Sequence, residues 1–165
     1  ILSDAGTLKR MDVIHMLNRP LFSVVMSSDI TSTNGIQTKV LFDQEYDDND
    51  SAYDAGNSRF VVPAGQGGTY FFRWTIKING QIDNKNVQTW LLRNGVWLDG
   101  QQPRNSEGSN SFTQEMVIGN TYLDECNPGA YYEVVVIHWA GSDATVMKEN
   151  SSFQGFKLTN VTYDP

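Results

Sequence analysis

Tyr70-Phe71-Phe72-Arg73-Trp74-Thr75-Ile76-Lys77-Ile78, residues 70–78, is the stretch that decides the fold. Large apolar side chains stand at every second position, and arginine, threonine and lysine stand at three of the positions between them. Side chains alternate between the two faces of a β-strand, so this pattern predicts an antiparallel strand with one face in the core. The Asn79-Gly80 pair that follows predicts a turn.

The same alternation occurs in shorter form on both sides of this stretch. Turn pairs such as Asn94-Gly95 and Asp99-Gly100 separate the segments, and no convincing helical period appears after residue 20. The pattern therefore predicts an all-β sandwich or jelly roll. The remaining expected strands are residues 21–26, 38–42, 58–62, 87–93, 96–98, 111–118, 131–139 and 153–161, with a loop over 101–110.

The composition fits one domain of this class and excludes several functions. The chain has 165 residues, 12% of them aromatic, and a net charge of −7. An acidic chain is a poor binder of nucleic acid or of anionic membranes, and no apolar run reaches the roughly 18 residues of a membrane-spanning helix. The single cysteine, Cys126, excludes an intrachain disulfide and a cysteine-rich zinc site. We expect Cys126 to be structural.

Residues 1–20 differ from the rest of the chain and are interpreted as a short N-terminal appendage to a domain spanning residues 21–165. Leu8, Met11 and Ile14 stand three apart, which favours one or two helical turns that begin at Thr7 and end before Pro20. A helix this short is not stable alone. The segment is therefore expected to act as a stalk, a linker or a docking element.

Several motifs are more specific than the alternation. Arg19-Pro20-Leu21-Phe22-Ser23-Val24 opens the strand region, and Ser151-Ser152-Phe153-Gln154-Gly155-Phe156-Lys157-Leu158 closes it. Between them, Leu91-Leu92-Arg93-Asn94-Gly95 ends a strand in a turn. A longer motif combines Phe42, Tyr53-Asp54, residues 57–65 and residues 68–72. Together these motifs resemble the C1q-like domain over residues 19–161.

The resemblance implies a C1q/TNF-type jelly roll that forms homotrimers and has no enzymatic activity. The sequence of residues 53–72, YDAGNSRFVVPAGQGGTYFF, looks most like that of C1q-like domains of bacteriophage and other viral structural proteins. It therefore implies a virion protein: the trimeric head of a fibre, tail or capsid decoration, involved in host-surface attachment. Residues 1–20 would contact other virion proteins, and the host ligand would be a glycan or a protein. No collagen Gly-X-Y run is present.

Two other functions differ from this expectation. A secreted, lectin-like recognition module would have the same domain, and the sequons Asn150-Ser151-Ser152 and Asn160-Val161-Thr162 would then be usable. A hydrolase on a jelly-roll scaffold is disfavoured, because His15 and His138 lie in no recognised nucleophile motif. We therefore expect a protein that is not an enzyme, located in the virion or, in the alternative, outside the cell.

The run Val134-Val135-Val136-Ile137, followed by His138, is nearly continuous in apolar residues. Such a strand is typically buried on both faces. In a two-sheet sandwich one face is covered by the opposite sheet, so the other face was expected to be covered by a neighbouring chain. Val134, Val135, Val136, Ile137 and His138 are thus the predicted oligomer interface.

The densest charge cluster lies between Asp43 and Asp54 and contains Asp47, Asp48 and Asp50. It is either a solvated acidic loop or a calcium site, because hard carboxylate oxygens are the ligands that calcium prefers. No other cofactor is expected. Three aromatic residues outside the alternating core, Tyr46, Tyr53 and Trp97, are either packed under loops or free to stack on sugars.

Overall fold

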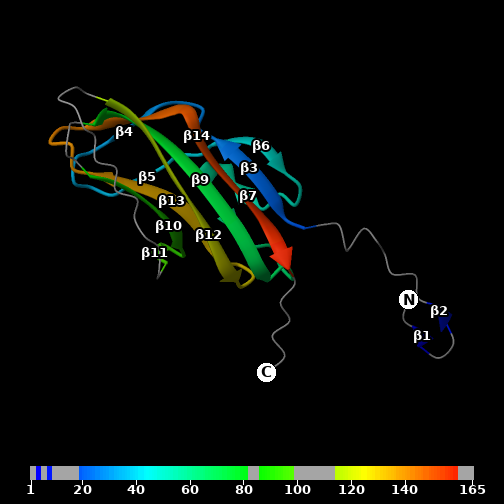
Figure 1. The fold of residues 1–165 in the computed structure, drawn as a ribbon. Helices are drawn as coiled ribbons and strands as arrows, with labels where there is room; N and C mark the ends of the chain where they lie inside the picture. The colour runs from blue at the N-terminus through cyan, green and yellow to red at the C-terminus, as the bar shows by residue number, and fades with distance from the viewer. Residues whose placement is uncertain (1–2, 5–6, 9–18, 82–85, 99–113, 160–165) are drawn as a thin grey trace.

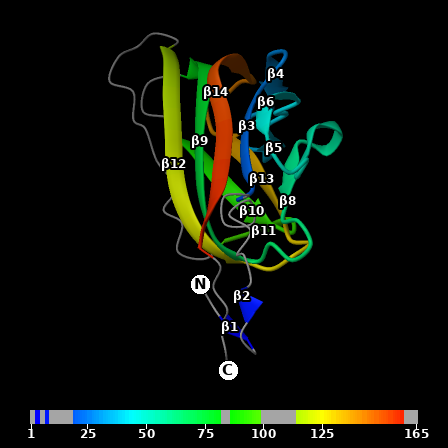
Figure 2. The same cartoon turned by 90° about the vertical axis from the view of Figure 1, so that its right-hand side faces the viewer.

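The computed structural model describes residues 3–4, 7–8, 19–81, 86–98 and 114–159. In this part of the chain, two six-stranded antiparallel sheets pack face to face (Figure 1, Figure 2). Sheet I has the order β12-β9-β14-β3-β6, with β4 also paired to β14, and sheet II has the order β11-β10-β13-β8-β7, with β5 also paired to β13. The all-β sandwich expected from the sequence is confirmed.

The strand bounds are as follows. They are β1 (Ser3–Asp4), β2 (Thr7–Leu8), β3 (Leu21–Val25), β4 (Ile30–Ser32), β5 (Thr38–Lys39), β6 (Gln44–Asp48), β7 (Tyr53–Asp54), β8 (Arg59–Val61), β9 (Gly68–Gln81), β10 (Val87–Arg93), β11 (Val96–Trp97), β12 (Gln114–Cys126), β13 (Tyr131–His138) and β14 (Ala144–Thr159), with one 3-10 turn, Ala55–Asn57.

Strand β9 lies at the centre of sheet I, between β12 and β14 (Figure 1). Its alternation is confirmed, since Tyr70, Phe72, Trp74, Ile76 and Ile78 are all fully buried between the sheets. The side chains between them point to the outer face of sheet I, which is the consequence of the two-residue period of a strand.

The core between the sheets is dominated by aromatic rings. Phe22 stacks on Phe60 with ring centroids 4.6 Å apart, and Phe72 stacks on Tyr132 at the same separation. Phe153 meets Phe22 edge-on at 4.8 Å. These rings come from both sheets, so burial of aromatic surface holds the sandwich together.

Two predicted turns have different outcomes. Asn94 and Gly95 both have positive φ, 53° and 76°, and connect β10 to β11 as expected. Asn79-Gly80, in contrast, lies inside β9. Gly80 has φ of 98°, and its N–H donates to Asn79 Oδ1 at 2.7 Å. The pair is therefore absorbed into the long strand as a local irregularity, and the predicted turn is wrong.

Several strand limits also differ from those predicted. The expected strand 38–42 is reduced to β5, while β12 and β14 extend well beyond the predicted residues 111–118 and 153–161. The acidic stretch is not entirely a loop, because β6 lies within it and pairs with β3 at the edge of sheet I.

Near the N-terminus, Thr7 lies in β2, which pairs with β1, so it does not begin a helix. The rest of the expected helix, the loop 101–110 and the sequon at Asn160 lie outside the described residues. In the part of the chain that the structure describes, no helix has the length and apolar character needed to cross a membrane.

Candidate functional site

The outer face of sheet I carries a continuous row of apolar side chains across four neighbouring strands. Leu123 on β12 pairs with Phe71 on β9, Phe71 pairs with Phe156 on β14, and Phe156 pairs with Leu21 on β3. We call these residues the apolar row. Leu123 is 57% exposed, Phe156 40% and Leu21 37%. Because contiguous exposed apolar surface is typical of a binding face, the row is the first candidate contact surface.

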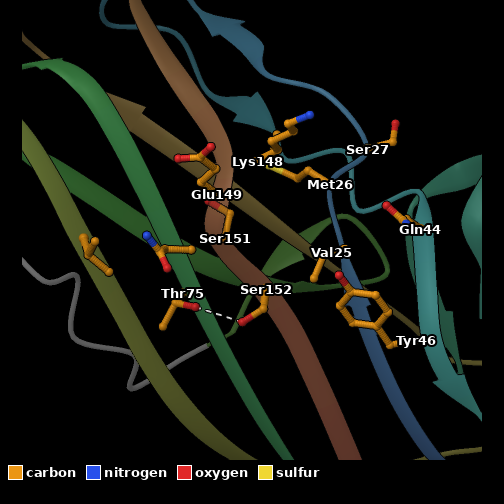
Figure 3. Close-up of a pocket in the computed structure, with 12 residues that line it drawn as sticks. Val25, Met26, Ser27, Gln44, Tyr46, Thr75, Lys148, Glu149, Ser151 and Ser152 are labelled. Carbon is orange, nitrogen blue, oxygen red and sulfur yellow. Dashed lines mark hydrogen bonds between the residues drawn. The ribbon is translucent and has the colours of Figure 1, made fainter.

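The largest hollow described lies toward the other end of the same face and has a volume of about 720 Å³. An irregularity of β14 creates it: Met147 pairs with Lys77 and Ser152 with Thr75, so the four residues 148–151 of β14 stand opposite the single residue Ile76 of β9. Asn150 in this bulge has φ of 62°. We call the hollow the bulge pocket (Figure 3).

Internal hydrogen bonds hold the wall and floor of the bulge pocket in place. Ser151 Oγ donates to the Met147 carbonyl at 2.6 Å and accepts from the Lys77 N–H at 2.9 Å, which replaces the ladder bonds lost in the bulge. The Thr75 and Ser152 hydroxyls lie 2.9 Å apart on the floor (Figure 3). The pocket is thus a formed feature of the sheet.

Tyr46, for which the sequence left open packing under a loop or stacking on a sugar, forms the opposite wall of the bulge pocket from β6 and is 72% exposed. Nearby, the Asp43 carboxylate accepts from the Ser27 backbone N–H and from the Ser27 hydroxyl, at 2.7 and 2.6 Å. The Ser27 hydroxyl bond lowers the pKa of Asp43. Asp43 does not line the pocket itself, but its carboxylate fixes Ser27, which does.

The outer face of sheet II carries a pair of tryptophans. Trp97 of β11 stacks on Trp90 of β10, with ring centroids 4.9 Å apart and planes at 9°. The Trp97 Nε1–H donates to Gln37 Oε1 at 2.7 Å. Trp97 is 48% exposed, so it is not packed under a described loop, and its role in ligand binding stays a hypothesis.

The structure contradicts the argument behind the predicted oligomer interface on β13, while the interface itself stays a prediction. Val134, Val136 and His138 point inward and are buried in the chain's own core. Val135 points to the outer face, opposite Trp90 in the ladder, yet is only 3% exposed. Because the single chain already buries these residues, their apolar run does not require a neighbouring chain; Ile137 alone is half-buried.

His138 is held in this core by hydrogen bonds at both ring nitrogens. Its Nε2 lies 2.9 Å from the Ser32 carbonyl oxygen, and its Nδ1 accepts from the Ala140 N–H at 3.4 Å. An acceptor at one nitrogen and a donor at the other require the proton on Nε2. The geometry gives His138 a packing role within sheet II.

The acidic stretch is used for local structure. The two oxygens of the Asp48 carboxylate accept from the backbone N–H groups of Ala52 and Tyr53, at 3.0 and 2.9 Å. Among the described residues, Asp47, Asp48 and Asp50 do not form part of any group of three or more potential metal ligands. The described residues therefore show no arrangement of ligands that supports the calcium hypothesis.

Tyr53 is not available to stack on a ligand. It is 6% exposed, and its hydroxyl donates to the Phe42 carbonyl at 2.9 Å inside the core. Burial raises the pKa of Tyr53. The alternative reading, packing under a loop, is the correct one for this residue.

A polar network that the sequence did not reveal closes one end of the sandwich. Arg93 on β10 donates to both oxygens of Asp124 on β12, at 3.2 and 3.0 Å, and the Tyr132 hydroxyl donates to the same carboxylate at 2.6 Å. Cys126 lies beside this network, is buried, and has its pKa raised to about 12 by burial. Its thiol is therefore protonated at neutral pH and is not a nucleophile.

The apolar row was also not predicted from the sequence. The signal was present in residues 70–78, where Phe71 interrupts the polar half of the alternation, and in Phe156, which the same two-residue period places on the face opposite to Phe153 and Gly155. Only the strand register shows that these residues meet side by side.

Comparisons with known proteins agree with the architecture. No protein-family model matches the chain, and no curated protein matches it in sequence. Three solved structures similar to it are the globular domain of zebrafish complement 1qA, Eiger TNF from S. frugiperda and murine APRIL. Their TM-scores are 0.55, 0.56 and 0.60, with 17%, 13% and 12% identity.

These matches extend over most of each chain. The match to complement 1qA covers 86% of this chain and 99% of the matched one. The match to Eiger TNF covers 89% and 96%, and the match to APRIL covers 86% and 100%. The chain therefore has the C1q/TNF jelly-roll fold, as the motifs predicted.

Proposed function

We propose that this chain is a non-enzymatic, homotrimeric recognition head, and that it serves as a virion structural protein in a fibre, tail or capsid decoration that attaches to the host surface. The observation that carries the proposal is the apolar row on the outer face of sheet I. The row is a feature of assembly rather than of catalysis, because it presents adjacent apolar side chains with no reactive group among them.

Trimer formation gives the apolar row a physical purpose. Phe71 and Phe156 already contact each other, with ring centroids 5.3 Å apart, and Leu21 and Leu123 flank them. Packing this row against copies of itself removes apolar surface from water at about 25 cal/mol per Å². The bulge pocket lies on the same face, so a neighbouring chain would border it. Three copies would also present three identical ligand sites and gain avidity.

The virion assignment is supported by the sequence of residues 53–72, which resembles viral C1q-like domains. The single cysteine, Cys126, is also consistent with assembly in a reducing cytoplasm, where disulfides do not form. In this proposal residues 1–20 connect the head to other virion proteins.

One observation bears on the alternative, a secreted lectin-like module. The first sequon places Asn150 at the exposed bulge of β14, where an oligosaccharyl transferase could reach it. However, Asn150 lines the bulge pocket on the proposed contact face. A glycan on Asn150 would therefore occupy the surface that a trimer needs, which favours the unglycosylated virion protein.

The proposal is tested in two parts. Light scattering of the purified chain at micromolar concentration should give three times the chain mass of 18.5 kDa. An antibody raised against the domain should then label intact particles purified from the source of the sequence. A monomer would contradict the assembly, and a trimer absent from every particle preparation would contradict the virion role while leaving the recognition head in place.

A further inference from the structure

We propose that Trp97 is the stacking platform of a carbohydrate site on the outer face of sheet II, and that the site takes a neutral pyranose sugar. This inference rests on the proposed recognition function and names the ligand class. It is carried by the geometry of Trp97, Trp90 and Gln37, with Lys39 and Glu133 beside them.

The platform is rigid before any ligand arrives. One face of the Trp97 ring lies parallel to Trp90, at 9° and 4.9 Å, and the Nε1–H is fixed on Gln37 Oε1. Gln37 immediately precedes β5, on the far side of β13 from β10, so Trp97 extends across the sheet. A ring held from below and at its edge loses little conformational entropy when a flat ligand packs on it.

Trp97 exposes more of its side chain to solvent than it would need to if it only covered Val135. Val135 beneath the pair is already 3% exposed, yet Trp97 remains 48% exposed, with Val96 beside it in the chain at 67%. Among the described residues, the buried Trp90 Nε1–H has no hydrogen-bond partner, so the Trp90 ring is held by stacking and burial alone, and the exposed face of the pair is that of Trp97.

Polar groups for sugar hydroxyls stand on the same face. Lys39 Nζ lies 2.5 Å from Glu133 Oε1, and the side chains are 32% and 16% exposed. In the ladders, Glu133 stands opposite Leu92, which in turn stands opposite Trp97, so the ion pair and the platform belong to one region. The charges of Lys39 and Glu133 neutralise each other, which favours a neutral ligand with both donors and acceptors.

A pyranose fits this combination better than a peptide or an acidic ligand. One face of a galactoside presents C–H groups that pack on an aromatic ring, while its hydroxyls require mixed donors and acceptors such as Gln37, Lys39 and Glu133. The platform lies on sheet II, and the apolar row lies on sheet I, so trimer formation would leave the platform open. Weak binding at one site would be reinforced by the other two.

The experiment is saturation-transfer NMR of the whole chain with methyl β-D-galactopyranoside, together with tryptophan fluorescence. We expect saturation transfer to the C–H face of the sugar and a saturable change in emission. Trp97→Ala should weaken binding at least about tenfold. Trp97→Phe, which retains an aromatic ring for packing on Trp90, guards against a misfolded alanine variant and should bind less tightly than the original chain.

Trp139→Ala is the matched control, because Trp139 is a comparably exposed tryptophan, at 40%, outside the platform. Binding should be unchanged in this variant. The inference is overturned if the sugar shows no transfer to the folded chain, or if Trp97→Ala and Trp97→Phe bind it as well as the original chain does. Light scattering of the same samples separates the two proposals: a trimer that binds no sugar contradicts only the carbohydrate site, and a monomer contradicts the assembly.

Discussion

Gly155 of β14 lies directly against the ring of Phe22 on β3. A Cβ atom at Gly155 would come within 2.6 Å of Phe22 Cε1 and within 2.9 Å of Phe72 Cδ1. Gly155 pairs with both residues in the sheet ladders, between β3 and β9. The glycine of the closing motif is therefore required by close packing of two core rings. Its backbone also borders a hollow of about 250 Å³ beside the apolar row.

Gly155→Ala should destabilise the fold, because the added methyl group forces the Phe22 and Phe72 rings out of their packed positions. Overpacking of this kind costs about 1–3 kcal/mol. For a chain of this size, each kcal/mol lowers Tm by about 2–4 °C. The measurement is thermal and denaturant unfolding at one fixed protein concentration, since assembly makes Tm depend on concentration.

Gly56→Ala is the control for this substitution. A Cβ at Gly56 would meet only Asp54 Oδ1 at 3.6 Å, an ordinary contact. We expect its Tm to stay close to that of the original chain. Equal stability of the Gly155→Ala and original chains would show that the packing at Phe22 is looser than the structure indicates.

The sequence predicted the fold well where one short period decided the structure. Residues 70–78 alternate cleanly, and their inward and outward faces are those expected. The Asn94-Gly95 turn was also predicted, because its positive φ values are a local property of those residues. Asn79-Gly80 has the same composition, but long-range pairing of β9 with β12 and β14 overrides its local preference.

The candidate site was much less accessible to sequence reasoning. Val135 was expected to need a neighbouring chain, but it is buried opposite Trp90, which Trp97 covers from a different strand. Likewise, Tyr53 and Tyr46 look equivalent in the acidic stretch, yet one is in the core and the other in the bulge pocket. These outcomes depend on register between distant strands, which a single sequence does not contain.

Phe156→Asp and Leu123→Asp should each convert the proposed trimer to a monomer. An aspartate in the apolar row would have to be desolvated on assembly without a partner charge, which opposes association. Both side chains are already solvent-exposed in the single chain, so its fold should survive. Light scattering and circular dichroism check the two parts of this expectation.

Ile36→Asp is the matched control for the apolar row. Ile36 is exposed to a similar degree, at 58%, but lies outside the row, next to Gln37. This variant should remain a trimer. If the two row variants also remain trimers at micromolar concentration, the contact face is not the outer face of sheet I.

Val136→Asp should unfold the single chain rather than only separate its copies. Val136 is fully buried between the sheets, and an unpaired carboxylate there costs several kcal/mol. Ile137→Asp, one position along and half-buried on the opposite face of β13, should be tolerated far better. Far-ultraviolet circular dichroism distinguishes the two, and equal stability of both variants would contradict the inward direction of Val136.

The thiol of Cys126 should resist alkylation in the folded chain. Burial raises its pKa from the ordinary value of 9.0 to about 12, so the reactive thiolate is scarce at pH 8. The folded chain holds this proton more tightly than the unfolded chain does. Its contribution to stability is therefore complete below pH 9 and is lost as pH rises toward 12.

The pH dependence is measured against Cys126→Ala, because lysines and tyrosines also titrate in this range. The free energy of unfolding of the original chain should fall more steeply than that of the variant above pH 9. Rapid iodoacetamide labelling of the native protein at pH 8 would show that Cys126 is more exposed than the structure places it.

Asp48→Ala should destabilise the chain without changing any response to calcium. The carboxylate of Asp48 accepts two backbone hydrogen bonds, from Ala52 and Tyr53, and loss of such charge-assisted bonds costs about 1–3 kcal/mol. Asp47→Ala is the control: Asp47 is exposed on the edge strand β6, and its substitution should leave Tm nearly unchanged. Calorimetric titration of the original chain with calcium should be flat. A saturable heat that both substitutions abolish would instead establish a metal site in the acidic stretch and assign Asp48 a ligand role in addition to its structural one.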